Sequence, residues 1–129
     1  MYGLSRLRFT GQTLVAILVL CFALVGAVMA QKVQPEQVAP GVWMVQGVSA
    51  LGSSANRNFI SNAAFVVTPG GVVVVDALGS PVLAQELVAA IRRITPAPIR
   101  HVVVTHYHAD HIYGLQVFKD LGAEVIAHR

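Results

Sequence analysis

Residues 105–114 read THYHADHIYG and contain three of the chain's five histidines, with one aspartate among them. The stretch begins where the apolar, strand-like segment HVVVT (101–105) ends, and it leads into a segment with helical character. In parallel sheets, ligands bind at the carboxyl ends of strands, where the loops converge. The sequence therefore predicts a ligand-binding loop at one edge of a sheet.

The donor types in this loop favour a metal site. His106 and His108 are separated by one residue, so both side chains point to the same side of an extended segment. They provide two imidazoles for one metal, and Asp110 and His111 provide a carboxylate and an imidazole for a neighbouring metal. Such donors suit zinc, at roughly 2.0–2.2 Å. The alternative is a surface loop that is histidine-rich by chance, and the number and spacing of the donors argue against it.

Cysteine content and charge exclude other kinds of site. The single cysteine, Cys21, lies in an apolar N-terminal run, so residues 31–129 contain none. Without thiolates, a disulfide is excluded in these residues, and the composition argues against a structural zinc finger or an iron–sulfur site. The same residues carry seven basic and six acidic side chains, which gives a net charge of +1. No basic stripe remains, so we expect no nucleic-acid partner.

The first 30 residues have the pattern of a secretory signal. Arg6 and Arg8 precede the 17-residue apolar run LVAILVLCFALVGAVMA, and a polar sequence begins at Gln31. We predict cleavage after Ala30, a secreted or periplasmic location, and no membrane association afterwards. The alternative is an N-terminal membrane anchor, because a run of 17 residues is at the lower limit of the ~17–25 needed to span a bilayer.

The segments around the histidine loop predict a mixed sheet. NAAFVVT (62–68), PGG (69–71) and VVVVD (72–76) form a hairpin, preceded by a strand at 42–47. The strand at 72–76 is apolar on both faces, so we expect it to be central and covered on both sides. A helix follows at 80–94, with Ser80 as its N-cap and Pro81 at its first position. Its buried stripe consists of Leu83, Leu87, Ile91 and Ile94.

The alternation continues to the end of the chain, with a strand at 101–105, a short helix at about 112–122 and a strand at 124–128. Strand–helix–strand connections predict parallel pairing. The fold class is therefore α/β of the α+β type, a mixed sheet with helices. The 99 residues from 31 to 129 contain too little helix to cover both faces of such a sheet. We therefore expect a truncated domain, the first half of a larger one.

Three features carry a family resemblance. THYHADH (105–111) resembles the H-x-H-x-D-H signature of the metallo-β-lactamase fold superfamily. Asp76 is similar to an aspartate that those proteins carry at the end of an early strand, and NAAFVVTPGGVVVVD (62–76) resembles their N-terminal hairpin. The likeness covers about residues 40–129. The leader and SNAAFVV (61–67) also resemble a periplasmic group, the quinoprotein relay system zinc metallohydrolases.

The resemblance implies the N-terminal half of an αββα sandwich of zinc-dependent hydrolases. By position, His106 and His108 would bind the first metal, and Asp110 and His111 the second. Asp76 would lie close to the metal or directly behind its ligands. The family's later ligands come from its C-terminal half, which this chain does not contain. The resemblance therefore implies a fragment that is incomplete for catalysis, with the missing C-terminal half as a potential partner.

The resemblance also implies a reaction. Hydroxide generated on one or two zinc ions would attack an ester-, thioester- or amide-like carbonyl of a small molecule, with Asp110 as the catalytic residue that orients the nucleophile. His111 differs from the residue that many zinc β-lactamases carry there, so we do not expect β-lactam cleavage. Two other classes stay open: a non-catalytic exported zinc-binding module and an inactive truncated product.

The remaining candidates have simpler interpretations. We expect His128 to be a surface residue at a strand end and His101 to be structural. Trp43 and Phe65 are expected in the core, and Asn62 is expected to hydrogen-bond within the hairpin. Tyr107 alternates away from the histidines, which predicts that it packs against the protein.

Overall fold

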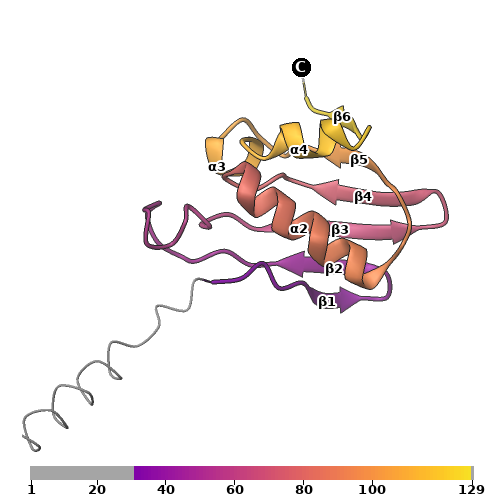
Figure 1. Cartoon of the computed structure of the whole chain (residues 1–129), viewed down its shortest axis with the longest axis horizontal. Helices are drawn as coiled ribbons and strands as arrows, with labels where there is room; N and C mark the ends of the chain where they lie inside the picture. Colours follow the sequence, from indigo (N-terminus) through magenta and orange to yellow (C-terminus); the bar gives the residue numbers. More distant parts are fainter. Residues whose placement is uncertain (1–30, 129) are drawn as a thin grey trace, which may run out of the picture.

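A computed structural model describes residues 31–128, so the predicted signal at 1–30 lies outside the described residues. These residues form one six-stranded sheet with the strands in chain order (Figure 1). The elements are β1 (Glu36–Ala39), β2 (Val42–Val45), β3 (Ala63–Thr68), β4 (Gly71–Val75), α2 (Pro81–Ile94), β5 (Ile99–Val103), α3 (Ala109–Ile112), α4 (Leu115–Asp120) and β6 (Glu124–Ile126).

The sheet changes from antiparallel to parallel at β4. Strands β1 to β4 pair antiparallel, whereas β4, β5 and β6 pair parallel. This confirms the predicted hairpin, the parallel pairing and the mixed α+β sheet. Because β4 and β5 run in the same direction, their carboxyl ends meet at one edge of the sheet. The residues that follow these two strands therefore lie side by side.

Helix α2 forms for the local reasons that its sequence suggests. Ser80 caps the helix by accepting a hydrogen bond from the backbone nitrogen of Leu83 at 3.2 Å, and Pro81 occupies the first turn. Leu83, Leu87 and Ile91 are fully buried against the sheet. Ile94 was expected in the same stripe but is 36% exposed, because the helix ends there.

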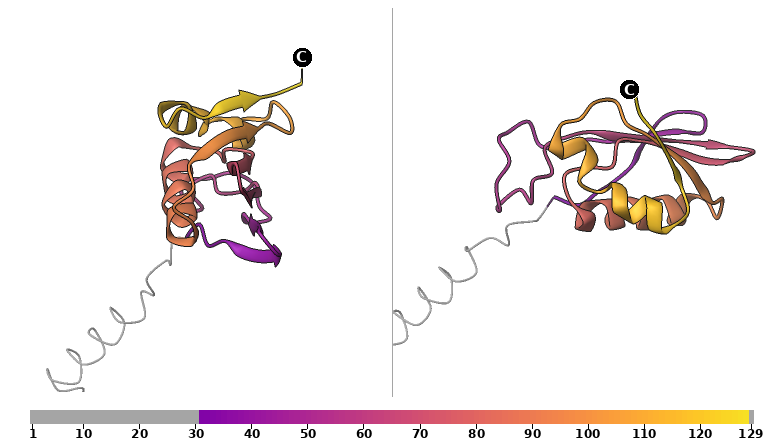
Figure 2. Two further views of the ribbon diagram at one scale, coloured as in Figure 1. Left: turned by 90° about the vertical axis from the view of Figure 1, so that its right-hand side faces the viewer. Right: turned by 90° about the horizontal axis from the view of Figure 1, so that it is seen from above.

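The core lies on the face of the sheet that the helices cover (Figure 2). Phe65, Val74 and Val102 have no exposed surface on that face. On β4, Val73 and Val75 point to the opposite face and are only half-buried. The central position predicted for this strand is confirmed. Cover on both faces is not found within residues 31–128, because all their helices pack on one side. No helix in the described part of the chain is long and apolar enough to cross a bilayer.

Several predicted boundaries were wrong. Strand β1 was not predicted, because all four residues of this edge strand are exposed and give no apolar alternation. The single helix expected at about 112–122 is two short helices that meet at Gly114. Strand β5 begins and ends two residues earlier than expected. The residues of the histidine loop therefore start leaving the sheet at Val104.

Candidate metal centre

The loops after β4 and β5 are tied together by backbone hydrogen bonds. The nitrogen of Asp76 donates to the carbonyl oxygen of Val103 at 2.9 Å, and the nitrogen of Ala77 donates to that of His111 at 2.8 Å. The nitrogen of Gly114 donates to the carbonyl oxygen of Leu78 at 3.2 Å. These bonds fix residues 76–78 against both the end of β5 and helix α3. The histidine loop therefore has a rigid support.

Asp76 adopts an uncommon backbone conformation at this junction. Its φ is 63°, in the left-handed region, and the residue is only 4% exposed. Leu78 has a φ of 64° and is fully buried. Aspartate tolerates this region better than most residues, whereas leucine does not. Such strain persists only where the surroundings over-determine the conformation, and it concentrates at functional sites.

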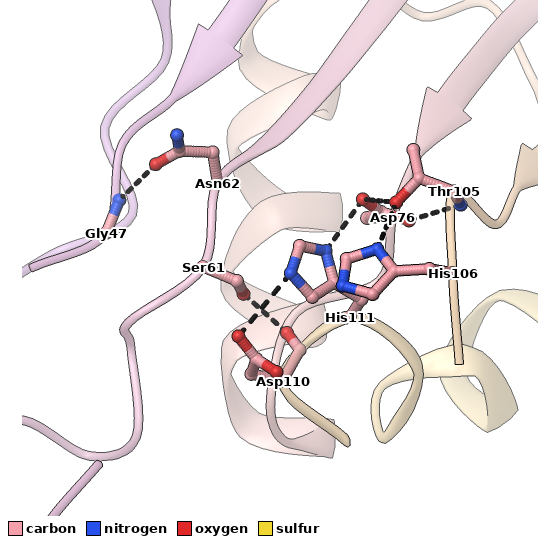
Figure 3. Close-up of polar contacts among 8 residues, drawn as sticks. All are labelled: Gly47, Ser61, Asn62, Asp76, Thr105, His106, Asp110 and His111. Carbon is pink, nitrogen blue, oxygen red and sulfur yellow. Dashed lines mark hydrogen bonds and ion pairs between the residues drawn. The ribbon is translucent and has the colours of Figure 1, made fainter. Parts of the chain in front are cut away.

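The carboxylate of Asp76 is the hub of the site (Figure 3). Its Oδ1 accepts a hydrogen bond from the backbone nitrogen of Thr105 at 2.8 Å. Its Oδ2 accepts one from the Thr105 hydroxyl at 2.7 Å and lies 2.8 Å from Nδ1 of His111. Because a carboxylate only accepts, Nδ1 of His111 carries a proton. In the neutral imidazole, Nε2 then presents its lone pair.

Three side chains at this site, including Asp76 itself, bring potential metal-ligand atoms close together. One ligand atom each from Asp76, His106 and His111 can be chosen so that all lie within 4.8 Å of one another. The ring centroids of His106 and His111 are 4.1 Å apart, and those of His106 and His108 are 4.7 Å apart. The described residues thus contain a candidate metal-binding triad, and a third imidazole lies next to it.

Asp110 and His108 flank the triad. Oδ2 of Asp110 lies 3.4 Å from Nε2 of His111, and His108 is the exposed N-cap residue of helix α3. The Ser61 hydroxyl donates to the backbone oxygen of Asp110 and so holds the start of α3 against the segment before β3 (Figure 3). The structure therefore places His106 and His108 in the loop after β5, and Asp110 and His111 in the helix α3 that follows it. Their assignment to two metals stays a prediction.

Two supporting residues were missed from the sequence. Thr105 was treated only as the end of a strand, although a hydroxyl residue directly before a histidine motif is a usable signal. Ser61 gives no local signal, because its contact with Asp110 spans 49 positions. Both act through hydrogen bonds that only the folded chain brings together.

The other predicted residues have these positions. Phe65 is fully buried, and the half-buried Trp43 stacks on it with ring centroids 6.1 Å apart.

Asn62 accepts a hydrogen bond from the nitrogen of Gly47 at 3.0 Å, which links the residues on either side of the 48–61 loop. His101 lies within β5, with Nε2 3.6 Å from a carboxylate oxygen of Glu124. Packing of Tyr107 was predicted wrongly: the residue is 82% exposed, because the loop has already left the sheet.

Comparison with known proteins identifies the family. The sequence model of the metallo-beta-lactamase superfamily matches residues 56–129, more than half of the chain. The chain belongs to this superfamily. Metallo-beta-lactamase type 2 from Bacillus cereus is 29% identical over 86 residues, which cover 67% of this chain and 32% of that enzyme. Linear primary-alkylsulfatase from Pseudomonas sp. (strain ATCC 19151) is 36% identical over 53 residues, which cover 41% and 10%.

A solved structure of the superfamily shares the fold. The NDM_FIM-1-like metallo-beta-lactamase from Erythrobacter litoralis, in its mono-zinc form, aligns with a TM-score of 0.60 and 26% identity. The alignment covers 79% of this chain and 46% of that protein. The chain thus spans less than half of this solved relative and a third or less of the curated ones. The residues matched by the superfamily model, 56–129, include the histidine loop.

Proposed function

We propose that the chain is the zinc-binding, N-terminal part of a hydrolase that cleaves an ester-, thioester- or amide-like carbonyl compound. The observation that carries the proposal is the buried Asp76 carboxylate, which orients His111 directly and contacts His106 through Thr105. Metal-binding histidines typically have such partners at their second nitrogen. Membership of a superfamily whose solved relative is a mono-zinc enzyme supports the choice of metal.

The donor set fits zinc. Imidazole nitrogens and carboxylate oxygens are typical zinc ligands, and residues 31–129 contain no cysteine to compete. We assign His106 and His108 to a first ion, and Asp110 and His111 to a second. Zinc bound there would make hydroxide available at neutral pH, because it lowers the pKa of bound water to about 7. We propose that the carboxylate of Asp110 orients the attacking group.

A hollow next to the histidine loop is the basis for proposing that the substrate carries an apolar group. This cavity of about 630 Å³ has His106, Tyr107 and His128 on its border. Its remaining lining is mostly aliphatic and consists of Val104, Thr105, Ile112, Leu115, Val125 and Ala127. Apolar walls with a few convergent polar groups are typical of small-molecule sites. We propose that the substrate places an apolar group in this hollow and its carbonyl near His106.

Further protein layers are part of the proposal. Val66, Val73 and Val75 are half-buried on the face of the sheet that no described helix covers. The solved relative is more than twice as long as the matched part of this chain. We propose that the C-terminal half of the domain covers this face and supplies further ligands. Export directed by residues 1–30 completes the proposal.

The first test concerns the ligands. Replacing His106 or His111 with alanine should weaken zinc binding by roughly 10-fold or more, because zinc-binding free energies of about 10–16 kcal/mol are shared among a few ligands. Isothermal titration calorimetry of the purified chain measures the effect. His101→Ala is the matched control, since this histidine lies within β5 next to Glu124 and should leave the affinity unchanged. Equal affinities for all three variants would refute the assignment.

The second test concerns the C-terminal half. Fusing the C-terminal half of the Bacillus cereus relative after residue 129 should raise zinc affinity by roughly 10-fold or more, because a catalytic zinc normally has three protein ligands and this loop offers two per ion. Competition with a chromogenic chelator measures the gain. The same fusion carrying His106→Ala is the control. A fusion that folds, as judged by circular dichroism, but binds zinc no more tightly would contradict the proposal.

Zinc binding without turnover is the second candidate function, and the small number of ligands in the described residues favours it. The two functions differ in one readout. A hydrolase part, once completed, should cleave a generic p-nitrophenyl ester or thioester in a way that a chelator abolishes. A zinc-binding module should bind the metal equally well with and without the added C-terminal half, and it should cleave neither substrate.

A further inference from the structure

The hydroxyl of Thr105 lies between the buried carboxylate and the first histidine of the motif. Its oxygen is 2.7 Å from Oδ2 of Asp76 and 2.9 Å from Nδ1 of His106 (Figure 3). A threonine hydroxyl has one hydrogen to donate and two lone pairs. Only one of the two neighbours can therefore receive that hydrogen, and the other must donate to the oxygen.

The carboxylate decides which neighbour receives it. If the hydroxyl donated to His106, the 2.7 Å contact between Thr105 and Asp76 would join two oxygens with no hydrogen between them. Charge-assisted hydrogen bonds to carboxylates are also about twice as strong as neutral ones. The hydroxyl therefore donates to Asp76, and Nδ1 of His106 must carry a proton and donate to Thr105. In the neutral ring, Nε2 then carries the lone pair.

We infer that Asp76 sets the tautomer of two histidines at once, His111 directly and His106 through Thr105, and that Thr105 is a positioning residue. Both rings then present Nε2 to the same region, although the two histidines lie five positions apart in the chain. This gives Asp76 a different role from that of a metal ligand, because its two oxygens already receive three hydrogen bonds from within the protein. The inference rests on the proposed function, because the tautomers matter only if the histidines bind zinc. The hydrogen bonds that set the tautomers are those of the metal-free protein.

The test is the protonation of the imidazole rings in the metal-free chain. Nitrogen-15 NMR of the histidine side chains at a pH where they are neutral should show the proton of His106 on Nδ1. Thr105→Val removes the hydroxyl while keeping the shape, so the proton should be free to move to Nε2 and the Nδ1-protonated fraction should fall. Thr105→Ser keeps the hydroxyl and should restore the original signals.

Zinc affinity provides the second readout. Thr105→Val should weaken binding by roughly 10-fold, the lower end of the effect of removing a residue that orients a metal ligand. Thr105→Ser should stay within a few-fold of the original. The matched control is Thr68→Val, because the Thr68 hydroxyl bonds only within the turn after β3. It should change neither readout.

The outcomes separate this inference from the proposed function. A lone pair on Nδ1 of His106 in the unaltered protein would overturn the inference, even if the valine variant failed to fold. A valine variant with unchanged tautomer and affinity would overturn it as well. If the tautomers are as stated and the protein binds no zinc, the inference stands and the proposed function fails.

Discussion

Asp76→Asn should weaken zinc binding by about 100-fold or more while leaving the metal-free protein almost as stable as before. The new amide would keep an oxygen for the backbone nitrogen of Thr105 and place its NH₂ group where Oδ2 now lies. Amide hydrogens would then be donated to the Thr105 hydroxyl and to Nδ1 of His111. The hydroxyl would turn and donate to His106, so both rings would carry their proton on Nε2.

The consequence is that both imidazoles lose the lone pair aimed at the metal. Removing one orienting partner typically costs 10–100-fold in metal affinity. Asp76→Asn would reverse the tautomers of two imidazole rings at once. Stability should fall by less than the ~1–3 kcal/mol of an unsatisfied buried group, because every donor still finds an acceptor. Asparagine also tolerates the left-handed backbone at φ 63°. Calorimetric zinc titration and urea unfolding of the metal-free chain measure the two effects.

Two variants make this result specific. Asp120→Asn changes an exposed carboxylate that accepts a hydrogen bond from the Gln116 side chain, away from the histidine loop, so it should change neither measurement. Asp76→Ala leaves the nitrogen of Thr105 and Nδ1 of His111 without partners, and it should lower both stability and affinity. If Asp76→Asn binds zinc as tightly as the unaltered chain, the carboxylate does not set the tautomers.

The sequence predicted those parts of the fold whose signals are local. The hairpin ending in Asp76, the cap of α2 at Ser80 and the parallel β4–β5–β6 unit follow from short runs of apolar residues, turn glycines and capping chemistry. Strand β1 was missed because an exposed edge strand needs no apolar face. Tyr107 was misplaced because strand periodicity was extended into a loop that had already left the sheet.

The types of residue in the site could be predicted from the sequence, but their hydrogen-bond partners could not. Three histidines and an aspartate within six positions indicate metal chemistry on their own. The contact between Asp76 and His111 spans 35 positions, and the one between Ser61 and Asp110 spans 49. Such pairs arise only when two strand ends meet at one edge of the sheet. The left-handed backbone of Asp76 is likewise imposed by tertiary contacts, since neighbouring residues give no turn signal for it.

Gly114→Ala should destabilise the protein by roughly 1–3 kcal/mol, the usual cost of overpacking. Gly114 has φ −84°, so no backbone strain opposes alanine there. A methyl group at this position would lie 2.0 Å from the backbone oxygen of Ala77 and 2.6 Å from Cβ of Ala84. Alanine is favoured over glycine in a helix interior by about 0.5–1 kcal/mol. Gly114 is the N-cap of α4 and not an interior residue, so this gain is smaller. The clash therefore outweighs it, and the free energy of unfolding falls.

The clash also links stability to the metal centre. Ala77 directly follows Asp76, and its nitrogen donates to His111, so relief of the clash must move either the carboxylate or helix α3. We expect zinc affinity to fall together with the urea midpoint. Gly70→Ala is the control, because its nearest neighbour would be the Thr68 hydroxyl at 3.8 Å, an ordinary contact. If Gly114→Ala lowers the unfolding free energy while zinc affinity stays unchanged, helix α3 can shift without disturbing the ligands, and the proposed rigid coupling between the two loops is wrong.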